Sequence, residues 1–254
     1  MFDSLRRHPF AVDAFFRHSL VLTFAYPTSL LQPLLPPGLT VDEHEGHGFV
    51  AIALVQTEKL RPAAFPAWAG RDFFLAGYRI FTRYRRLDGK NLRGLRILRS
   101  YTDRRFMVWS GNLFTGYGYR HCRSRCERTA TTLDCTITTR DGDGDVTVLA
   151  HIGEAATAPP AGSPFADLTI ARRFAGPLPF TFGYEAATHS IVIVQGLREQ
   201  WQPMPVQVER VRCAFLERGP FAGVPLRLAN AFFVENIPYH WQRGEVERLP
   251  PEVR

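Results

Sequence analysis

The sequence predicts a single α+β domain dominated by a curved, mostly antiparallel β-sheet. Strand-like runs, apolar or alternating, recur through the chain and are separated by glycine, proline and aspartate turns. Helical periodicity is confined to short segments. The composition is the same on both sides of the best linker candidate, residues 155–162. We therefore expect residues 1–254 to form one domain.

The composition is that of a globular protein. Hydrophobic residues make up 45% of the 254 residues and charged residues 22%, so extensive disorder is not expected. No run approaches the roughly 18 apolar residues that span a bilayer. Residues 1–24 carry charged side chains where a secretory signal would be apolar. We expect a soluble, cytoplasmic protein without a membrane partner.

The first elements lie before residue 60. The segment 10–26 mixes aromatic and β-branched residues and ends at Pro27. Leu30, Leu31, Leu34 and Leu35 then follow the spacing of a short helix, which the sequence Pro36-Pro37-Gly38 ends. Residues 49–55 form a continuous apolar run of the length expected for a strand that is buried on both faces.

A hairpin and a helix are predicted next. The strand-like segments 78–85 and 94–100 are joined around Asp88-Gly89, a strong hairpin signal. Thr102 or Asp103 is expected to cap a helix. Its apolar positions, Phe106, Trp109 and Leu113, fall three and four residues apart, as in an amphipathic helix.

Beyond that helix the pattern is that of a meander. Residues 119–128, 133–140 and 146–153 are predicted strands, and the aspartate-rich turn 141–145 joins the last two. A short helix is expected to begin with Ser163 as N-cap and to end before Gly176. Residues 189–194 and 226–234 are further predicted strands, whereas residues 206–216 fit a strand or a helix.

The net charge is +7, and nearly all of the basic residues are arginines, because the only lysines are Lys59 and Lys90. Six arginines cluster in the predicted hairpin, interleaved with aromatic residues: Arg79, Arg83, Arg85, Arg93, Arg96 and Arg99. That pattern is compatible with single-stranded nucleic acid. A solvated sheet edge gives the same pattern, and no RNA-recognition signature accompanies it, so we favour the sheet edge. If some of these arginines enter a pocket, they would favour carboxylates.

Two segments, one acidic and one rich in histidine, contain side chains of the types that bind metals. The turn 141–145 has alternate carboxylates but lacks the glycine and glutamate of a calcium loop, and we interpret it as a hairpin turn. The segment 44–47 holds two histidines, separated by Glu45-Gly46, and is interpreted as a polar loop. The four cysteines, at positions 122, 126, 135 and 213, are predicted to be buried and reduced. We expect neither a metal nor a cofactor.

The most informative segment is Ser110-Gly111-Asn112-Leu113-Phe114-Thr115-Gly116-Tyr117-Gly118-Tyr119-Arg120-His121. It resembles the active-site signature of acetoacetate decarboxylases, Gly-Arg-Glu-x-x-Gly-[Tyr/Phe]-Pro-Lys-Lys, in which one lysine forms a Schiff base with a keto acid. Tyr119 and Arg120 stand at the lysine positions. Neither side chain is an amine nucleophile, so the resemblance implies that imine catalysis cannot operate there.

The resemblance is closest to the YqjF-like family of uncharacterised proteins (DUF2071) within the acetoacetate decarboxylase-like superfamily. Leu31-Gln32-Pro33-Leu34-Leu35-Pro36-Pro37-Gly38-Leu39 resembles the opening motif of that family, and Tyr119 and His121 match its Tyr-x-His segment. The resemblance implies a curved sheet or barrel of cone-like shape with flanking short helices and an internal pocket.

Two classes of function remain open. In the first, the pocket binds a small organic acid or carbonyl compound through substrate-binding residues that we predict to be Arg99, Asn112, Gly116, Tyr119, Arg120 and His121. If the protein is an enzyme, Tyr119 and His121 are the catalytic candidates for a lyase or isomerase-type reaction without a Schiff base. In the second, the protein is a non-catalytic interaction module. Either class is compatible with a homo-oligomer.

Overall fold

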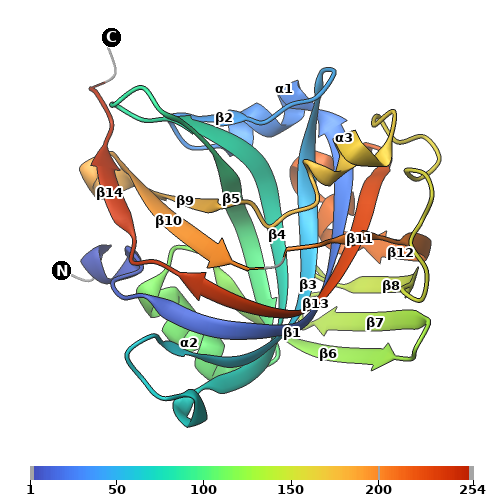
Figure 1. Cartoon of the computed structure of the whole chain (residues 1–254). Helices are drawn as coiled ribbons and strands as arrows, with labels where there is room; N and C mark the ends of the chain where they lie inside the picture. The colour runs from blue at the N-terminus through green and yellow to red at the C-terminus, as the bar shows by residue number, and fades with distance from the viewer. Residues whose placement is uncertain (1–2, 200, 252–254) are drawn as a thin grey trace.

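The computed structural model describes residues 3–199 and 201–251 and consists of one large mixed sheet with few helices (Figure 1). The strands are β1 (Val12–Pro27), β2 (Leu39–Val41), β3 (His47–Pro62), β4 (Arg71–Arg85), β5 (Asn91–Thr102), β6 (Tyr119–Arg128), β7 (Thr132–Thr139), β8 (Val146–His151), β9 (Phe180–Glu185), β10 (Ser190–Arg198), β11 (Met204–Pro205), β12 (Gln207–Cys213), β13 (Leu228–Trp241) and β14 (Glu245–Arg248). The helices are α1 (Thr28–Leu31), α2 (Arg105–Phe114) and α3 (Leu168–Arg172). The predicted α+β class is confirmed.

The strand pairings curve the sheet back on itself. Neighbouring strands follow the order β12-β8-β7-β6-β5-β9-β10-β13-β1-β3-β4-β2, and β5 also pairs with β4. The path from β5 through β9, β10, β13, β1 and β3 to β4 therefore returns to β5. Pairing is antiparallel except that β5 runs parallel to β6 and to β9. The predicted hairpin at Asp88-Gly89 joins β4 to β5, and the predicted meander is β6–β7–β8.

Alternate residues of the long strands divide the core in two. One buried cluster joins β1, β3 and β4 to the β6–β7–β8 layer, and includes Leu20, Tyr78 and Ile137. The other is built on the opposite faces of the same strands, where Phe81 packs with Phe174. This division follows from the two-residue period of a β-strand. Figure 1 shows the β6–β7–β8 layer to one side of the long strands.

Helix α2 differs from the prediction in its cap and in its buried face. No side chain caps it at Arg104, and the carboxylate of Asp103 instead accepts a hydrogen bond from the Phe74 backbone at 2.8 Å. Phe106 and Trp109 are 57% and 63% exposed, whereas Met107 and Gly111 are the buried residues of the helix. The predicted helix is confirmed, but two of its three apolar marker residues are exposed because the helix is rotated to bury its Met107 face.

The start of helix α3 also differs from the prediction, and one segment that the sequence left open is now assigned. Helix α3 begins after Asp167, whose carboxylate accepts a hydrogen bond from Ile170 N at 2.8 Å, so Ser163 is not its N-cap. The hydroxyl of Ser163 instead donates to the Ala229 carbonyl. The ambiguous segment 206–216 contains strand β12, followed by a 3₁₀ turn at Ala214–Glu217.

The prediction of four buried, reduced cysteines was wrong for one pair. Cys126 of β6 and Cys135 of β7 lie directly opposite each other with their Cα atoms 4.1 Å apart, and they form a disulfide. Cys122 and Cys213 are buried free thiols. In the described ranges no helix has the length and apolar character needed to cross a membrane.

A buried ion cluster stabilises one part of the sheet and gives a test of the fold. The Asp42 carboxylate is fully buried and accepts hydrogen bonds from Arg83, at 2.7 Å, and from Arg93. Asp42→Ala should lower the free energy of unfolding by about 3 kcal/mol, because it leaves two partly buried guanidinium groups without their counter-ion. Urea denaturation measures this change. Glu127→Ala breaks an exposed pair with Arg125 and should cost less than about 1 kcal/mol. An equal loss in both variants would contradict the argument.

Candidate functional site

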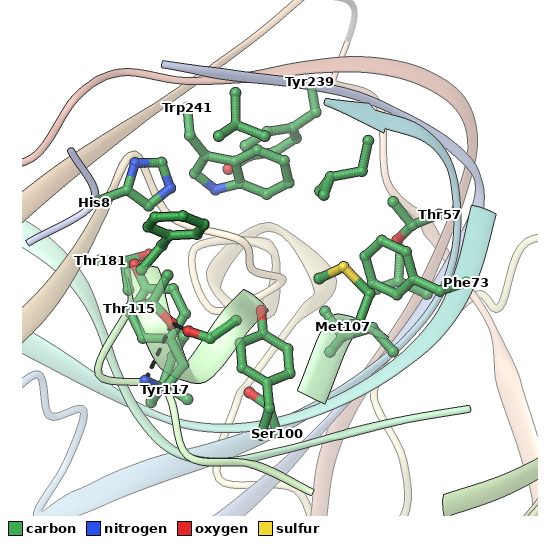
Figure 2. A pocket seen from close by; sticks show the side chains of 18 of the residues that line it. His8, Thr57, Phe73, Ser100, Met107, Thr115, Tyr117, Thr181, Tyr239 and Trp241 are labelled. Atoms are coloured by element: carbon green, nitrogen blue, oxygen red, sulfur yellow. Dashed lines mark hydrogen bonds between the residues drawn. The ribbon is translucent and has the colours of Figure 1, made fainter. Parts of the chain in front are cut away.

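A cavity of about 150 Å³ lies among the strands that return on themselves. Residues from β1, β3, β4, β5, β6, β9 and β13 line it, together with α2, the segment between α2 and β6, and the segment that precedes β1. Figure 2 shows the labelled side chains surrounding a common space, with Tyr239 and Trp241 on one side and Ser100, Met107 and Thr115 on another. The lining comes from both ends of the chain, so the cavity depends on the complete fold.

The walls are mainly apolar and aromatic. Phe16, Tyr239 and Trp241 pack against one another, with ring centroids separated by 4.8 Å for Phe16–Tyr239 and 4.3 Å for Tyr239–Trp241. The other apolar lining side chains are Phe10, Val12, Val55, Leu60, Phe73, Leu75, Ile97, Met107 and Phe114. No acidic residue and no lysine lines the cavity in the described part of the chain.

Arg79 is the one residue with a formal positive charge in this lining. The pairing of β4 with β5 shifts register between Tyr78 and Arg79, and Gly77 leaves room for the side chain, since a Cβ there would lie 3.0 Å from its Nη2. Within the described residues the guanidinium has no carboxylate partner, and its buried Nε has no hydrogen-bond partner. Burial lowers the pKa of Arg79 from its usual high value, but arginine stays protonated in proteins.

The tyrosines around Arg79 do not supply its missing counter-charge. Burial raises the pKa of Tyr119 to about 12, and it also raises the pKa of Tyr117 and of Tyr239. All three phenols are therefore neutral near pH 7 and can donate hydrogen bonds. The interior around Arg79 carries an uncompensated positive charge.

The segment between α2 and β6 positions Tyr119. The side chain of Asn112 holds the Tyr119 backbone on both sides, since Oδ1 accepts from its N–H at 2.8 Å and Nδ2 donates to its carbonyl at 2.9 Å. A Cβ at Gly111 would lie 2.4 Å from the Tyr119 ring, so only glycine permits this approach. Gly118 has a φ of +62°, a conformation that glycine adopts without strain.

His8 closes another part of the lining. Its backbone N–H donates to Phe114 O at 3.0 Å, and its carbonyl accepts from Gly244 N at 2.8 Å, so the segment before β1 is fixed to α2 and to the β13–β14 turn. The ring is buried and its Nδ1 has no hydrogen-bond partner among the described residues. Burial lowers the pKa of His8 to about 4, so the ring is neutral near pH 7.

Of the six predicted binding residues, Tyr119 lines the main cavity and the other five lie elsewhere. Arg99 and Arg120 both pair with Asp143, at 3.1 and 2.9 Å. His121 is exposed on β6. Asn112 hydrogen-bonds to the Tyr119 backbone without lining the cavity, and Gly116 lines a neighbouring pocket.

The sequence reasoning missed several groups that give this cavity its polar character: His8, Thr57, Tyr117 and Tyr239. Arg79 belongs to the six arginines for which a pocket position stays open in the sequence, because alternation along a strand does not say which face lines a cavity. His8 and Tyr239 are distant in sequence from the signature segment. Tyr117 lay within the segment but outside the positions that matched the motif.

The family model of an uncharacterized conserved protein, DUF2071, matches residues 13–238. The chain belongs to the DUF2071 family. That match spans most of the strands that build the cavity, including β4 with Arg79 and α2 with Asn112. A search of curated proteins gives no match.

Solved structures with the same fold are acetoacetate decarboxylase-like. An acetoacetate decarboxylase-like enzyme from Sphingomonas wittichii RW1 has a TM-score of 0.59 and 15% identity, covering 97% of this DUF2071 chain and 94% of its own. Acetoacetate decarboxylase from Legionella pneumophila gives 0.59 and 13%, with 92% and 87% coverage. The enduracididine biosynthesis enzyme MppR, complexed with pyruvate, gives 0.61 and 10%, with 94% and 90% coverage. At these identities the likeness concerns the fold alone.

The buried His8 ring predicts an acid-sensitive contribution to stability. The folded pKa is about 4 and the unfolded value about 6.5, so below pH 6.5 only the unfolded chain takes up this proton. The neutral His8 ring makes its full contribution to the free energy of unfolding above pH 6.5, and this contribution is lost as the pH falls to 4. Between pH 7 and 4.5 wild type should lose roughly 2 to 3 kcal/mol more than His8→Asn, measured by urea unfolding. Asparagine is chosen because it tolerates the positive φ of 56° at this position.

His121→Asn is the matched control, because it replaces an exposed histidine. It should keep the pH dependence of wild type. If the free energy of unfolding of His8→Asn depends on pH as that of wild type does, the His8 ring is not held neutral in the folded protein.

Proposed function

We propose that this protein binds a small organic acid in the internal cavity, with the ligand carboxylate paired to Arg79. The observation that carries the proposal is the cavity-lining guanidinium of Arg79, whose buried Nε has no hydrogen-bond partner and which has no carboxylate partner in the described chain. A buried charge is expensive unless it is paired, and its cost is tolerated where a bound group completes the pair. An anionic ligand supplies that partner.

A carboxylate suits Arg79 in this site. The planar guanidinium pairs with a carboxylate through two parallel hydrogen bonds. Neutral tyrosines beside it, Tyr117 and Tyr119, can donate further hydrogen bonds to the same oxygens or to a carbonyl group of the ligand. The remaining walls are mainly apolar and carry no further formal charge, so they favour a ligand with one charged end.

Lysine imine chemistry is not part of this proposal. Lys59 is exposed and lies outside the cavity, and Lys90 is exposed and pairs with Asp88 at 3.6 Å. Chemistry on a bound acid would have to use the cavity's own proton carriers, which are the His8 ring and the phenol hydroxyls. The protein would then differ from an acetoacetate decarboxylase in mechanism while sharing its fold.

The structure offers less support for a nucleic-acid interface on the arginine-rich hairpin. Arg83 and Arg93 bind Asp42, Arg86 binds Glu247 at 2.9 Å, and Arg99 binds Asp143. Arginines that are paired within the chain contribute little to phosphate binding, because a phosphate would first have to displace their carboxylates. The interaction-module alternative rests on exposed aromatic side chains, of which Trp68 is 86% exposed.

Replacing Arg79 should abolish acid binding. A thermal-shift and calorimetric screen with pyruvate, acetoacetate and benzoate should show at least one acid that stabilises wild type. Arg79→Met should weaken the binding of that acid about 30-fold or more, because a buried charge-assisted hydrogen bond contributes about 2 kcal/mol. Arg99→Met, which removes an arginine outside the cavity, should bind as wild type does. Equal binding by both variants would defeat the proposal.

The same substitution should stabilise the ligand-free protein. Arg79→Met removes a desolvated charge that has no partner and replaces it with an apolar side chain of similar length, so the free energy of unfolding should rise by about 1 kcal/mol or more. Arg99→Met should lower it or leave it unchanged, because it removes an ion pair with Asp143. Urea denaturation without ligand compares the two. A loss of stability in Arg79→Met would indicate a structural role for the guanidinium.

A further inference from the structure

We propose that the acid bound by this cavity is a single-ring aromatic monocarboxylate, oriented with its carboxylate at Arg79 and its ring among the aromatic walls. This inference rests on the proposed function and narrows it from small acids in general to one chemical class. Three features of the cavity lead to it: its size, the composition of its walls and its charge.

The size of the cavity matches one ring. An enclosed apolar protein cavity of about 150 Å³ holds a benzene molecule. The cavity here has about the same volume. A two- or three-carbon keto acid would leave part of the apolar wall without contacts, and unfilled apolar space forfeits dispersion energy. A fused two-ring acid would exceed the space that is present.

The walls are enriched in aromatic side chains. Eight of the 25 lining residues are Phe, Tyr or Trp, whereas these make up 13% of the whole chain. Phe16 and Trp241 lie with ring centroids 5.7 Å apart, within the range of favourable aromatic contacts. Phe73 and Met107 face the same space in Figure 2. Methionine sulfur and aromatic edges both make favourable contacts with an aromatic ring.

The charge of the cavity selects a monoanion. Arg79 is the one formally charged lining residue in the described chain, and the His8 ring is neutral. A second carboxylate on the ligand would be buried without a counter-ion, which is strongly unfavourable. An uncharged aromatic ligand would leave the guanidinium unpaired. One ring with one carboxylate satisfies both conditions.

The test compares acids that differ in one property at a time. Isothermal titration calorimetry of the full chain is run with benzoate, cyclohexanecarboxylate, pyruvate, phthalate and 1-naphthoate, and with benzamide as the uncharged ring. We expect benzoate to bind at least tenfold more tightly than pyruvate, phthalate, 1-naphthoate or benzamide, and more tightly than cyclohexanecarboxylate. Fluorescence lost on benzoate binding in wild type but not in Trp241→Phe would place the ring beside Trp241.

The outcomes separate this inference from the proposed function. Pyruvate binding as tightly as benzoate, with both lost in Arg79→Met, overturns the aromatic class and leaves acid binding intact. Benzamide binding as tightly as benzoate overturns both proposals, as does the absence of binding by any acid in the series. If cyclohexanecarboxylate binds as tightly as benzoate, the cavity selects ring size without aromatic contacts. That outcome also overturns the aromatic class.

A variant that narrows the apolar part of the cavity provides an independent check. Leu75 lines the cavity on β4, four residues before Arg79 and on the same face of the strand. Leu75→Phe should weaken the binding of benzoate at least tenfold and should change the dissociation constant of pyruvate by less than threefold. If Leu75→Phe does not fold, Leu75→Ala is used, and it should improve binding of 1-naphthoate relative to benzoate. Equal effects on all acids would contradict the orientation that we propose.

Discussion

The position of the Arg79 guanidinium in the cavity wall, without a carboxylate partner among the described residues, is the constraint on which the site depends. The strands that surround it, a register shift between β4 and β5 and the space left by Gly77 accompany this position. The neighbouring phenols are held neutral by the same burial. Such an arrangement lowers the stability of the ligand-free protein and gives an anion a preformed, poorly solvated partner.

Comparison with Arg83 shows that this chain can neutralise an arginine on the same strand face. Arg83 lies four residues beyond Arg79, so the two side chains leave β4 on the same side. There the buried Asp42 receives both Arg83 and Arg93, which makes a complete ion cluster. No comparable carboxylate reaches Arg79 from any described residue. The Arg83 and Arg93 guanidinium groups are therefore neutralised within the chain, whereas Arg79 has no carboxylate partner among the described residues.

Much of the fold could be predicted from the sequence, because turns and alternation are local signals. The hairpin at Asp88-Gly89 and the β6–β7–β8 meander are examples. The orientation of α2 could not be predicted, since Phe106 and Trp109 are apolar but the helix buries Met107 against the cavity. Arg79 and His8 could not be assigned either. Their environment arises from pairings between β4 and β5 and between distant backbone segments, and no local pattern records those contacts.

The segment that resembles the decarboxylase signature retains a structural role without its lysines. Asn112 fixes the Tyr119 backbone, Gly111 lets the ring approach α2, and Gly118 allows the chain to enter β6. Together they place a neutral hydroxyl-bearing side chain in the cavity instead of an amine. Since Arg79 lies on β4, the charge of this site comes from a different element than the signature segment. The arginine of the cavity and the segment that resembles the signature therefore reach the cavity from separate elements of the sheet.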